Sequence, residues 1–325
     1  MDLAVSPSMP GFSAPELVDL VVAAERLGYS EAWVAEVAGP EAFSLLGALA
    51  ARTSQLALGV AVVPAMTRSP ALLAMAAGTV SQLLGGRTFG LGIGSSSHVI
   101  VEQWHDAEFA PPLGRVGETV EATRALLEGE REYEGAHVAT RRFRLASPPS
   151  GPVRLFVGAL GPRMLRVAGA VGDGVCLNLM PASAVPRQLA EIRRGAEAAG
   201  RALPEHFRVM ARFHLVITED PEAGRGLIRG AFGPYFAQPV YNRFLGWLGH
   251  EEEAAAIAGA FAAGDREAVA AAFHDALVDG VSLVGTVGEI RERLDEYADA
   301  GVDVGALNFI GDPGSIADGL RALAP

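Results

Sequence analysis

The sequence predicts a (β/α)8 TIM barrel with insertions, and three observations favour this fold class. Apolar strand-like segments and amphipathic helix-like segments alternate about eight times along the 325 residues, which fits a closed barrel better than an open doubly wound sheet. Several apolar segments are hydrophobic at almost every position, as is typical of parallel strands buried on both faces. The length suits one large barrel, because such barrels hold roughly 250 residues or more. No linker divides the chain, so we expect residues 1–325 to form a single domain.

The first half of the chain supplies four strands and three helices of this pattern. The helix over residues 14–27 has the clearest end signals, since Ser13 and Glu16 have capping-box spacing and Gly28 follows as a helix-ending residue. The apolar run over residues 55–63 has the pattern of a fully buried strand. The remaining strands are expected at residues 3–5, 32–35 and 87–93, and the remaining helices at residues 41–52 and 70–84.

The second half continues the alternation with two interruptions. Residues 130–145 look like a small hairpin that turns at Glu134, Gly135 and Ala136. Residues 230–280 have a helical pattern, are rich in alanine, and are longer than one barrel helix requires. We expect these insertions near the active face or at an oligomer interface. The strands are expected at residues 153–158, 174–179, 208–218 and 304–310, and the helices at residues 163–171, 184–199, 287–300 and 315–323.

The composition excludes several kinds of protein. The net charge of −12 argues against a nucleic-acid-binding surface or an anionic membrane anchor, since both need clustered positive charge. All 26 basic residues are arginine, which excludes a Schiff-base, pyridoxal-phosphate or P-loop lysine. Cys176 is the single cysteine, so no intrachain disulfide forms, and the histidines lack metal-site spacing.

The beginning of the chain and its apolar stretches predict a location. Residues 1–5 lack the basic and apolar regions of a signal peptide, and the longest apolar stretches are too short to span a bilayer. We therefore expect a cytoplasmic protein that binds a small molecule and has no metal, nucleic-acid or membrane partner.

Two turns at predicted strand ends are candidates for chemistry, because barrel enzymes place their sites at the C-terminal ends of the strands. Gly158, Ala159, Leu160 and Gly161 lead through a proline into a helix, and such a turn can hold a phosphate at a helix N-terminus. The second turn has glycines that allow close backbone approach and three hydroxyls, those of Ser95, Ser96 and Ser97. Each turn on its own also fits an ordinary connection from strand to helix.

Several ordered segments together carry a resemblance to a known family. The chain resembles the luciferase-like monooxygenase superfamily, and within it the branch that uses the deazaflavin coenzyme F420. The resemblance covers residues 2–179 well and the C-terminal third loosely. The segments that carry it are residues 58–64, 67–77, 85–94, 101–105, 157–169 and 172–174.

The resemblance implies a bacterial-luciferase-like barrel and an F420-dependent oxidoreductase, which passes a hydride between the deazaflavin and a small organic substrate. It implies a cis peptide bond between Ala61 and Val62, at a third-strand bulge that presses on the deazaflavin ring. It also implies an acid near the ring edge, at Glu36. The acidic tail of F420 would need arginines at the mouth of the pocket, and Arg163 after the phosphate turn and Arg68 after the third-strand bulge are placed where this tail could pass. By the same resemblance, the phosphate turn is Gly158, Ala159, Leu160 and Gly161, and the turn along the ribityl chain or ring is Ser95, Ser96 and Ser97.

The family contains alternatives that the sequence leaves open. A reduced-FMN-dependent monooxygenase shares the phosphate turn but activates O2, and a barrel that binds flavin without turnover suits the few acid–base groups at the strand ends. F420-dependent glucose-6-phosphate dehydrogenases carry a histidine and a glutamate where this chain has Val37 and Ser97, and they use lysines that this chain lacks. Sugar-phosphate oxidation is therefore disfavoured. Relatives are usually dimers through their second and third helices, so we expect a homodimer.

Glu36, His98 and Cys176 can each be interpreted in two ways. Glu36 is either the ring-edge acid or a strand-end acid paired with an arginine. His98 follows the serine turn and could donate or relay a proton, because histidine titrates near neutral pH, or it could be a surface histidine at a helix start. We take Glu36 and His98 as the candidate catalytic residues. Cys176 lies in a predicted buried strand and is better explained as a small core residue than as a nucleophile.

Overall fold

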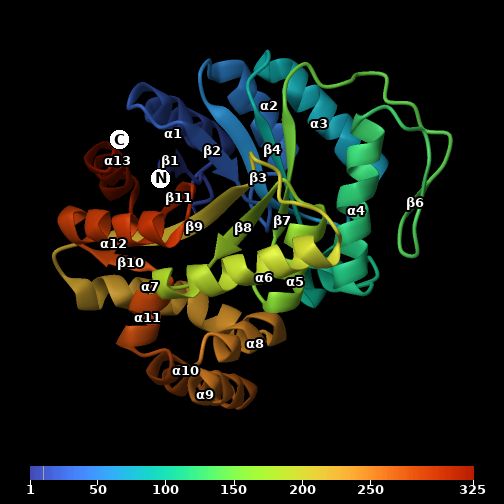
Figure 1. Cartoon of the computed structure of the whole chain (residues 1–325). Helices are drawn as coiled ribbons and strands as arrows, with labels where there is room; N and C mark the ends of the chain where they lie inside the picture. The colour runs from blue at the N-terminus through green and yellow to red at the C-terminus, as the bar shows by residue number, and fades with distance from the viewer. Residues whose placement is uncertain (10) are drawn as a thin grey trace.

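Eight parallel strands close into a barrel in the computed structural model of the chain, which describes residues 1–9 and 11–325 (Figure 1). Each strand pairs in parallel with its neighbour, and the ring closes where Gly174–Asn178 pairs with Arg208–Arg212. The predicted (β/α)8 fold is confirmed. The barrel strands are β1 (Asp2–Val5), β2 (Glu31–Val34), β3 (Ala57–Pro64), β4 (Phe89–Gly94), β7 (Val153–Gly158), β8 (Gly174–Asn178), β9 (Arg208–Ile217) and β11 (Val304–Phe309).

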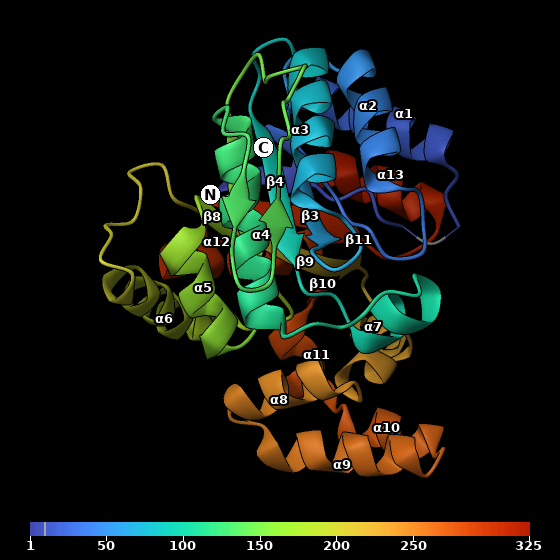
Figure 2. The same ribbon diagram turned by 90° about the vertical axis from the view of Figure 1, so that its right-hand side faces the viewer.

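Helices cover the outside of the barrel (Figures 1 and 2). The expected bounds agree with the observed ones to within two residues. The capping box is present, since the Glu16 carboxylate accepts hydrogen bonds from Ser13 N and Oγ at 2.7 and 2.6 Å. No described helix is both long and apolar enough to cross a membrane. The covering helices are α1 (Ala14–Arg26), α2 (Ala42–Arg52), α3 (Pro70–Leu84), α4 (Pro112–Leu127), α5 (Pro162–Val171), α6 (Val185–Ala198), α12 (Val287–Ala300) and α13 (Pro313–Ala322).

The sequence pattern did not indicate four short or weakly patterned elements. Helix α4 was missed because its buried face includes Thr119, Ala122 and Thr123, which give little hydrophobic contrast with its exposed face. The π-helical turn η1 (Val99–Trp104) follows the serine turn. Strand β10 (Leu283–Gly285) has only three residues and pairs with the end of β9. The short helical turn η2 (Ala182–Ala184) leads into α6.

The segment near residues 130–145 contains a small antiparallel pair, β5 (Tyr133–Glu134) and β6 (Ala139–Thr140). Its turn lies slightly later than the sequence suggested, because Gly135 N–H donates to the Val138 carbonyl at 2.9 Å. The Glu118 carboxylate on α4 accepts hydrogen bonds from three backbone N–H groups of this turn. Two more side chains of α4 bind the hairpin, since Arg115 donates to the His137 carbonyl at 2.7 Å and Glu121 accepts from the Tyr133 hydroxyl at 2.9 Å.

A second group of helices starts directly after β9 and lies beside one end of the barrel, as Figure 2 shows. It has an apolar cluster of its own, which includes Phe236, Ile257, Phe273 and Leu277. We call this group the helical insertion. It begins at Pro221, earlier than the expected residue 230. Its helices are α7 (Pro221–Phe236), α8 (Pro239–Trp247), α9 (Glu251–Ala262), α10 (Arg266–Ala272) and α11 (Asp275–Val281).

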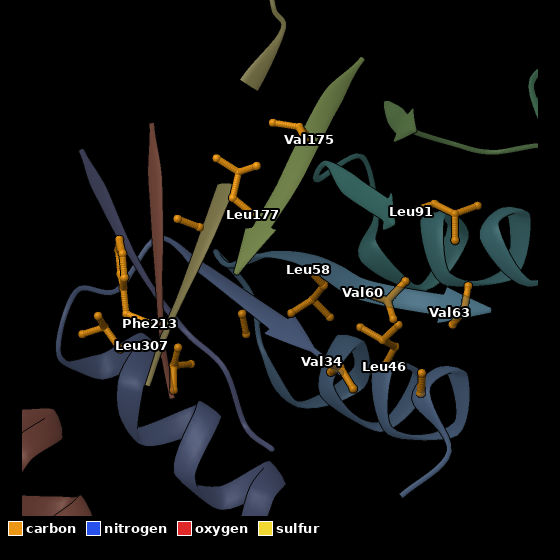
Figure 3. Packing of buried hydrophobic residues seen from close by; sticks show 14 of the residues in the cluster. Val34, Leu46, Leu58, Val60, Val63, Leu91, Val175, Leu177, Phe213 and Leu307 are labelled. Atoms are coloured by element: carbon orange, nitrogen blue, oxygen red, sulfur yellow. The ribbon is translucent and has the colours of Figure 1, made fainter. Parts of the chain in front are cut away.

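The main hydrophobic core lies between the strands and the covering helices (Figure 3). Leu58 and Val60 of β3 and Leu91 of β4 are fully buried together with Leu46 of α2. These residues occupy alternate positions along each strand, so the positions between them point into the barrel. Two different sets of side chains are therefore buried on the two faces of the strands.

Inside the barrel, Trp33 occupies the space that two glycines leave free. A Cβ atom at Gly59 or at Gly90 would lie 2.4 Å from an atom of the Trp33 ring. The Trp33 Nε1–H donates to Glu31 at 2.6 Å, and Arg208 donates to the same carboxylate at 2.6 Å. The N-terminal end of the barrel is thus closed by an indole and an ion pair.

We expect Gly90→Ala to lower the free energy of unfolding by about 1–3 kcal/mol, because its methyl group would overlap the Trp33 ring. Urea denaturation would measure the loss. The loss should shrink when Trp33 is replaced by leucine in the same chain. The control is Gly226→Ala at an exposed position inside α7, where a Cβ meets no atom within 4 Å and the free energy of unfolding should rise by about 0.5–1 kcal/mol. Equal effects at the two positions would contradict this account.

Candidate active site

The third strand ends in an irregular segment at the C-terminal mouth of the barrel. The peptide bond between Ala61 and Val62 is cis, as expected. The register of β3 against β4 shifts between Val60 and Val63, which is the expected bulge. Ala61 and Val62 are half-buried and pack against the residues inside the barrel.

Val62 lies against glycines of two neighbouring strands. A Cβ atom at Gly94 would lie 2.5 Å from Val62 Cγ2, and one at Gly158 would lie 3.0 Å from Val62 Cγ1. The glycines at the ends of β4 and β7 therefore make room for this side chain. Val62 reaches across the mouth and, together with Ala61, forms a floor on which a flat ligand could rest.

The turn between β7 and α5 has unused hydrogen-bond donors. Gly161 is the N-cap of α5, and within residues 1–9 and 11–325 no acceptor lies on the backbone N–H groups of Leu160, Gly161 and Arg163. A Cβ atom at Gly161 would meet nothing within 4 Å, so the space in front of the turn is open. The Arg163 side chain is exposed beside it. Free donors at the positive end of a ten-residue helix suit a phosphate.

The serine turn follows β4 and leads into η1. Ser95, Ser96 and Ser97 are all half-buried, and Ser96 has a φ of 58°, in the left-handed region. The Ser97 carbonyl accepts from Val101 N–H at 2.9 Å, which starts η1. His98 comes next with 65% of its side chain exposed, and its ring stacks on Phe109 at 3.8 Å between centroids. The serines thus face the mouth, whereas His98 lies on its rim.

Glu36 is paired with an arginine. Its carboxylate accepts from Arg68 Nε and Nη2 at 3.2 and 2.7 Å and from Ala42 N–H at 3.0 Å. Arg68 also bonds Glu41 at 2.6 Å. Although burial opposes the effect, hydrogen bonds from Ser44, the Phe43 backbone and Arg68 lower the pKa of Glu41 to about 2. Arg68 therefore forms ion pairs with two carboxylates, those of Glu36 and Glu41.

Sequence reasoning missed a polar cluster inside the mouth, which we call the mouth cluster: Asn178, Arg212, His214 and Asn308. Asn308 Oδ1 accepts from Arg212 Nη2 at 3.0 Å and lies 2.9 Å from His214 Nδ1. His214 Nε2 lies 3.0 Å from the side-chain amide of Asn178. These residues come from β8, β9 and β11, so the barrel alone brings them together.

His214 is neutral and its tautomer follows from its neighbours. Burial and the nearby Arg212 charge lower the pKa of His214 well below 6.5. Asn308 Nδ2 donates to the carbonyls of Ser6 and Ser8, so Asn308 Oδ1 must be the acceptor for His214 Nδ1–H. Nε2 then carries a lone pair and faces Asn178 Oδ1, so the Asn178 amide donates from Nδ2 only when its oxygen and nitrogen are exchanged by a 180° turn. A buried neutral imidazole of this kind orients its neighbours and does not release protons near pH 7.

One signal in the sequence could have revealed this cluster. Arg212 and His214 alternate with Phe213 and Leu215 in a strand whose other residues, apart from Arg208 at its start, are apolar. Because alternate residues of a barrel strand point inward, two polar residues at this spacing indicate a polar patch inside the mouth. Asn308 is likewise a polar residue in an apolar strand, two residues after Ala306 and next to the end of β11.

Comparison with known proteins identifies relatives over most of the chain. Residues 2–304 match the profile of the family described as luciferase-like monooxygenase. The chain is 31% identical over 303 residues to the 5,10-methylenetetrahydromethanopterin reductase of Archaeoglobus fulgidus, covering 90% of this chain and 89% of that protein. It is 28% identical over 313 residues to a putative coenzyme F420-dependent oxidoreductase of Mycobacterium tuberculosis, covering 87% and 88%.

Solved structures share the fold. An F420-dependent secondary alcohol dehydrogenase in complex with an F420-acetone adduct superimposes with a TM-score of 0.81 at 17% identity, over 100% of this chain and 99% of that chain. At this identity the likeness establishes the barrel architecture alone.

We expect acid to destabilise the protein through His214. Its pKa in the folded state lies well below 6.5, so the unfolded chain binds a proton that the folded chain does not as the pH falls below about 6.5. The free energy of unfolding should then decrease by up to about 1.4 kcal/mol per pH unit. Urea denaturation at pH 7, 6 and 5 should show a smaller decrease for His214→Gln. The exposed His206→Gln variant should keep the wild-type slope, and equal slopes in all three proteins would contradict a buried neutral His214.

Proposed function

The chain belongs to the luciferase-like monooxygenase family, and from this premise we propose an oxidoreductase that uses coenzyme F420 and passes a hydride between the deazaflavin and a small organic substrate. One observation carries the proposal: along most of both chains, this protein matches a relative named for F420 dependence and another named as a reductase. The unused donors of the phosphate turn and the floor at Ala61 and Val62 support it.

Each part of the mouth has a role in this proposal. The N–H groups of Leu160, Gly161 and Arg163 would hold the phosphate, and the exposed Arg163 side chain would meet the acidic tail. Ala61 and Val62 would support the ring, and the serine turn would line the ribityl chain. The bound coenzyme supplies the hydride chemistry, whereas the protein supplies position and electrostatics.

The groups that could handle a proton differ in access. The Glu36 carboxylate accepts three hydrogen bonds, so its proposed role is to fix Arg68 and the start of α2 beside the ring edge. His214 is buried and neutral. His98 is exposed directly after the serine turn and lies 3.7 Å from Glu102, so solvent reaches its ring next to the mouth. We assign it the role of proton relay.

Parallel titration with F420 and FMN tests the proposal. F420 should bind at least tenfold more tightly than FMN, and reduced or oxidised F420 should turn over with an organic acceptor or donor. Tighter binding of FMN would instead support a reduced-FMN-dependent monooxygenase. Binding without turnover of any acceptor would support a barrel that only carries the coenzyme.

The Gly161→Val variant tests the phosphate turn within the same titration. Its side chain would fill the open space in front of the turn, so F420 affinity should fall about tenfold or more, or roughly 1.4 kcal/mol. The control is Gly226→Val, on an exposed face of α7. Unchanged affinity in a folded Gly161→Val protein would remove this turn from the site.

For assembly, the proposal includes a homodimer through α2 and α3 that works in the cytoplasm. Helix α3 exposes Leu72, Met75 and Leu83 at spacings that place them on one stripe. Exposed apolar stripes of this kind are typical of surfaces that a partner covers.

Light scattering should give a solution mass of about twice the 33.8 kDa of one chain. A Met75→Glu, Leu83→Glu double variant should be monomeric, because two carboxylates would be buried without partners in the interface. Leu227→Glu, at an equally exposed leucine of α7, should stay dimeric. A monomeric wild type would overturn the dimer.

A further inference from the structure

Arg212 is a half-buried cation without a carboxylate partner. No carboxylate in residues 1–9 and 11–325 lies within 4.0 Å of it, and its Nε is buried without an acceptor. Its one hydrogen bond goes to Asn308, through Nη2. By contrast, Arg208 pairs with Asp2 and Glu31. Arg208 lies four residues before Arg212, on the same face of β9. A partly buried charge whose Nε–H has no acceptor is costly, so the missing counter-ion calls for an explanation.

The neighbours of Arg212 are neutral groups that can donate hydrogen bonds. Tyr235 and Tyr241 of the helical insertion lie close enough to interact with its charge. Burial raises the pKa of Tyr241 to about 12, so this phenol keeps its proton. Burial lowers the pKa of Arg212 to about 10, which leaves it charged near pH 7. Together with neutral His214, these groups present one positive charge and several donors to whatever lies in front of them.

Arg212 is two residues beyond Met210, which belongs to the cluster that Ala61 and Val62 of the floor pack against. Arg212 lies opposite Asn178, the last residue of β8, in the strand pairing. Above it, rings of the helical insertion form a wall: Phe232 packs on His214 at 4.3 Å, and Tyr235 lies between Phe232 and Tyr241 at 5.8 and 5.5 Å. Successive rings are inclined to one another by 51°, 55° and 75°, so the wall presents both ring faces and ring edges beside the charge.

We propose that Arg212, Tyr235 and Tyr241 form a subsite for a carboxylate group of the substrate, and that the aromatic wall holds the flat apolar part of the same molecule. The substrate class is then a small aromatic or unsaturated organic acid. The inference rests on the proposed function for what happens to this acid, but binding of the acid does not require the coenzyme. A bidentate or charge-assisted contact to the guanidinium would supply the absent counter-ion.

The coenzyme itself also carries acidic groups, and the structure favours the substrate as the source of the anion. The phosphate turn lies at the end of β7, and the exposed Arg163 beside it offers a route to solvent for an acidic tail. Arg212 instead lies inside the mouth, beneath the helical insertion. An anion at Arg212 would therefore lie beside the aromatic rings of the helical insertion and apart from the phosphate turn.

Calorimetry with the coenzyme-free protein tests the subsite directly, using benzoate as the probe and benzamide as its neutral match. Benzoate should bind at least tenfold more tightly than benzamide. Arg212→Met should abolish this preference, and Tyr241→Phe, which retains the ring, should weaken benzoate about three- to tenfold. The control Arg141→Met, on the exposed hairpin, should bind benzoate as the wild type does.

The outcomes separate this inference from the proposed function. Any of three results would overturn the subsite, whatever the coenzyme does. The first is no benzoate binding, and the second is equal binding of benzoate and benzamide. The third is unchanged benzoate affinity in both Tyr241→Phe and a folded Arg212→Met. An Arg212→Met protein that loses F420 affinity but keeps the benzoate preference would assign the anion to the coenzyme and also overturn it. A protein that binds benzoate as expected but not F420 would retain the subsite and refute the proposed function.

Discussion

The limited space inside an eight-stranded barrel is the constraint on which the rest of the structure depends. Side chains that point inward from neighbouring strands compete for one volume, so each large residue needs small ones beside it. Gly59 and Gly90 leave space for Trp33, and Gly94 and Gly158 leave space for Val62. The first arrangement fills the body of the barrel. The second shapes the floor of its mouth, so the packing that stabilises the barrel also prepares a surface for a flat ligand.

The sequence was informative where the signal is local. Hydrophobic periodicity located the strands and most helices, and α4 was missed because threonine and alanine line its buried face. The resemblance located the cis bond at Ala61–Val62. The mouth cluster was missed because His214 and Asn308 are 94 residues apart and meet only when the ring of strands has closed. The partner of Glu36 was equally hidden, since nothing near residue 36 singles out Arg68 among 26 arginines.

Arginine side chains have different partners at the two ends of the barrel. At the N-terminal end, Arg208 is neutralised by Asp2 and Glu31, and these groups need nothing from outside the chain. At the C-terminal end, Arg212 has an amide as its partner and keeps donors free. In barrel enzymes the first end is concerned with stability and the second with chemistry. Arginine on β9 thus serves stability at position 208 and chemistry at position 212. Only the partners of the two guanidinium groups distinguish these roles.

The helical insertion has a consequence for how such a protein can diversify. Its apolar cluster is largely its own and meets the barrel at Leu179 of the loop after β8 and Val216 of β9. Mutations on α9 and α10, whose buried residues belong to this cluster, can therefore accumulate without disturbing the strands that hold Val62 and the phosphate turn. An exchange of this segment between paralogues, or its randomisation in a library, would change which molecules enter the mouth while the hydride machinery is inherited intact.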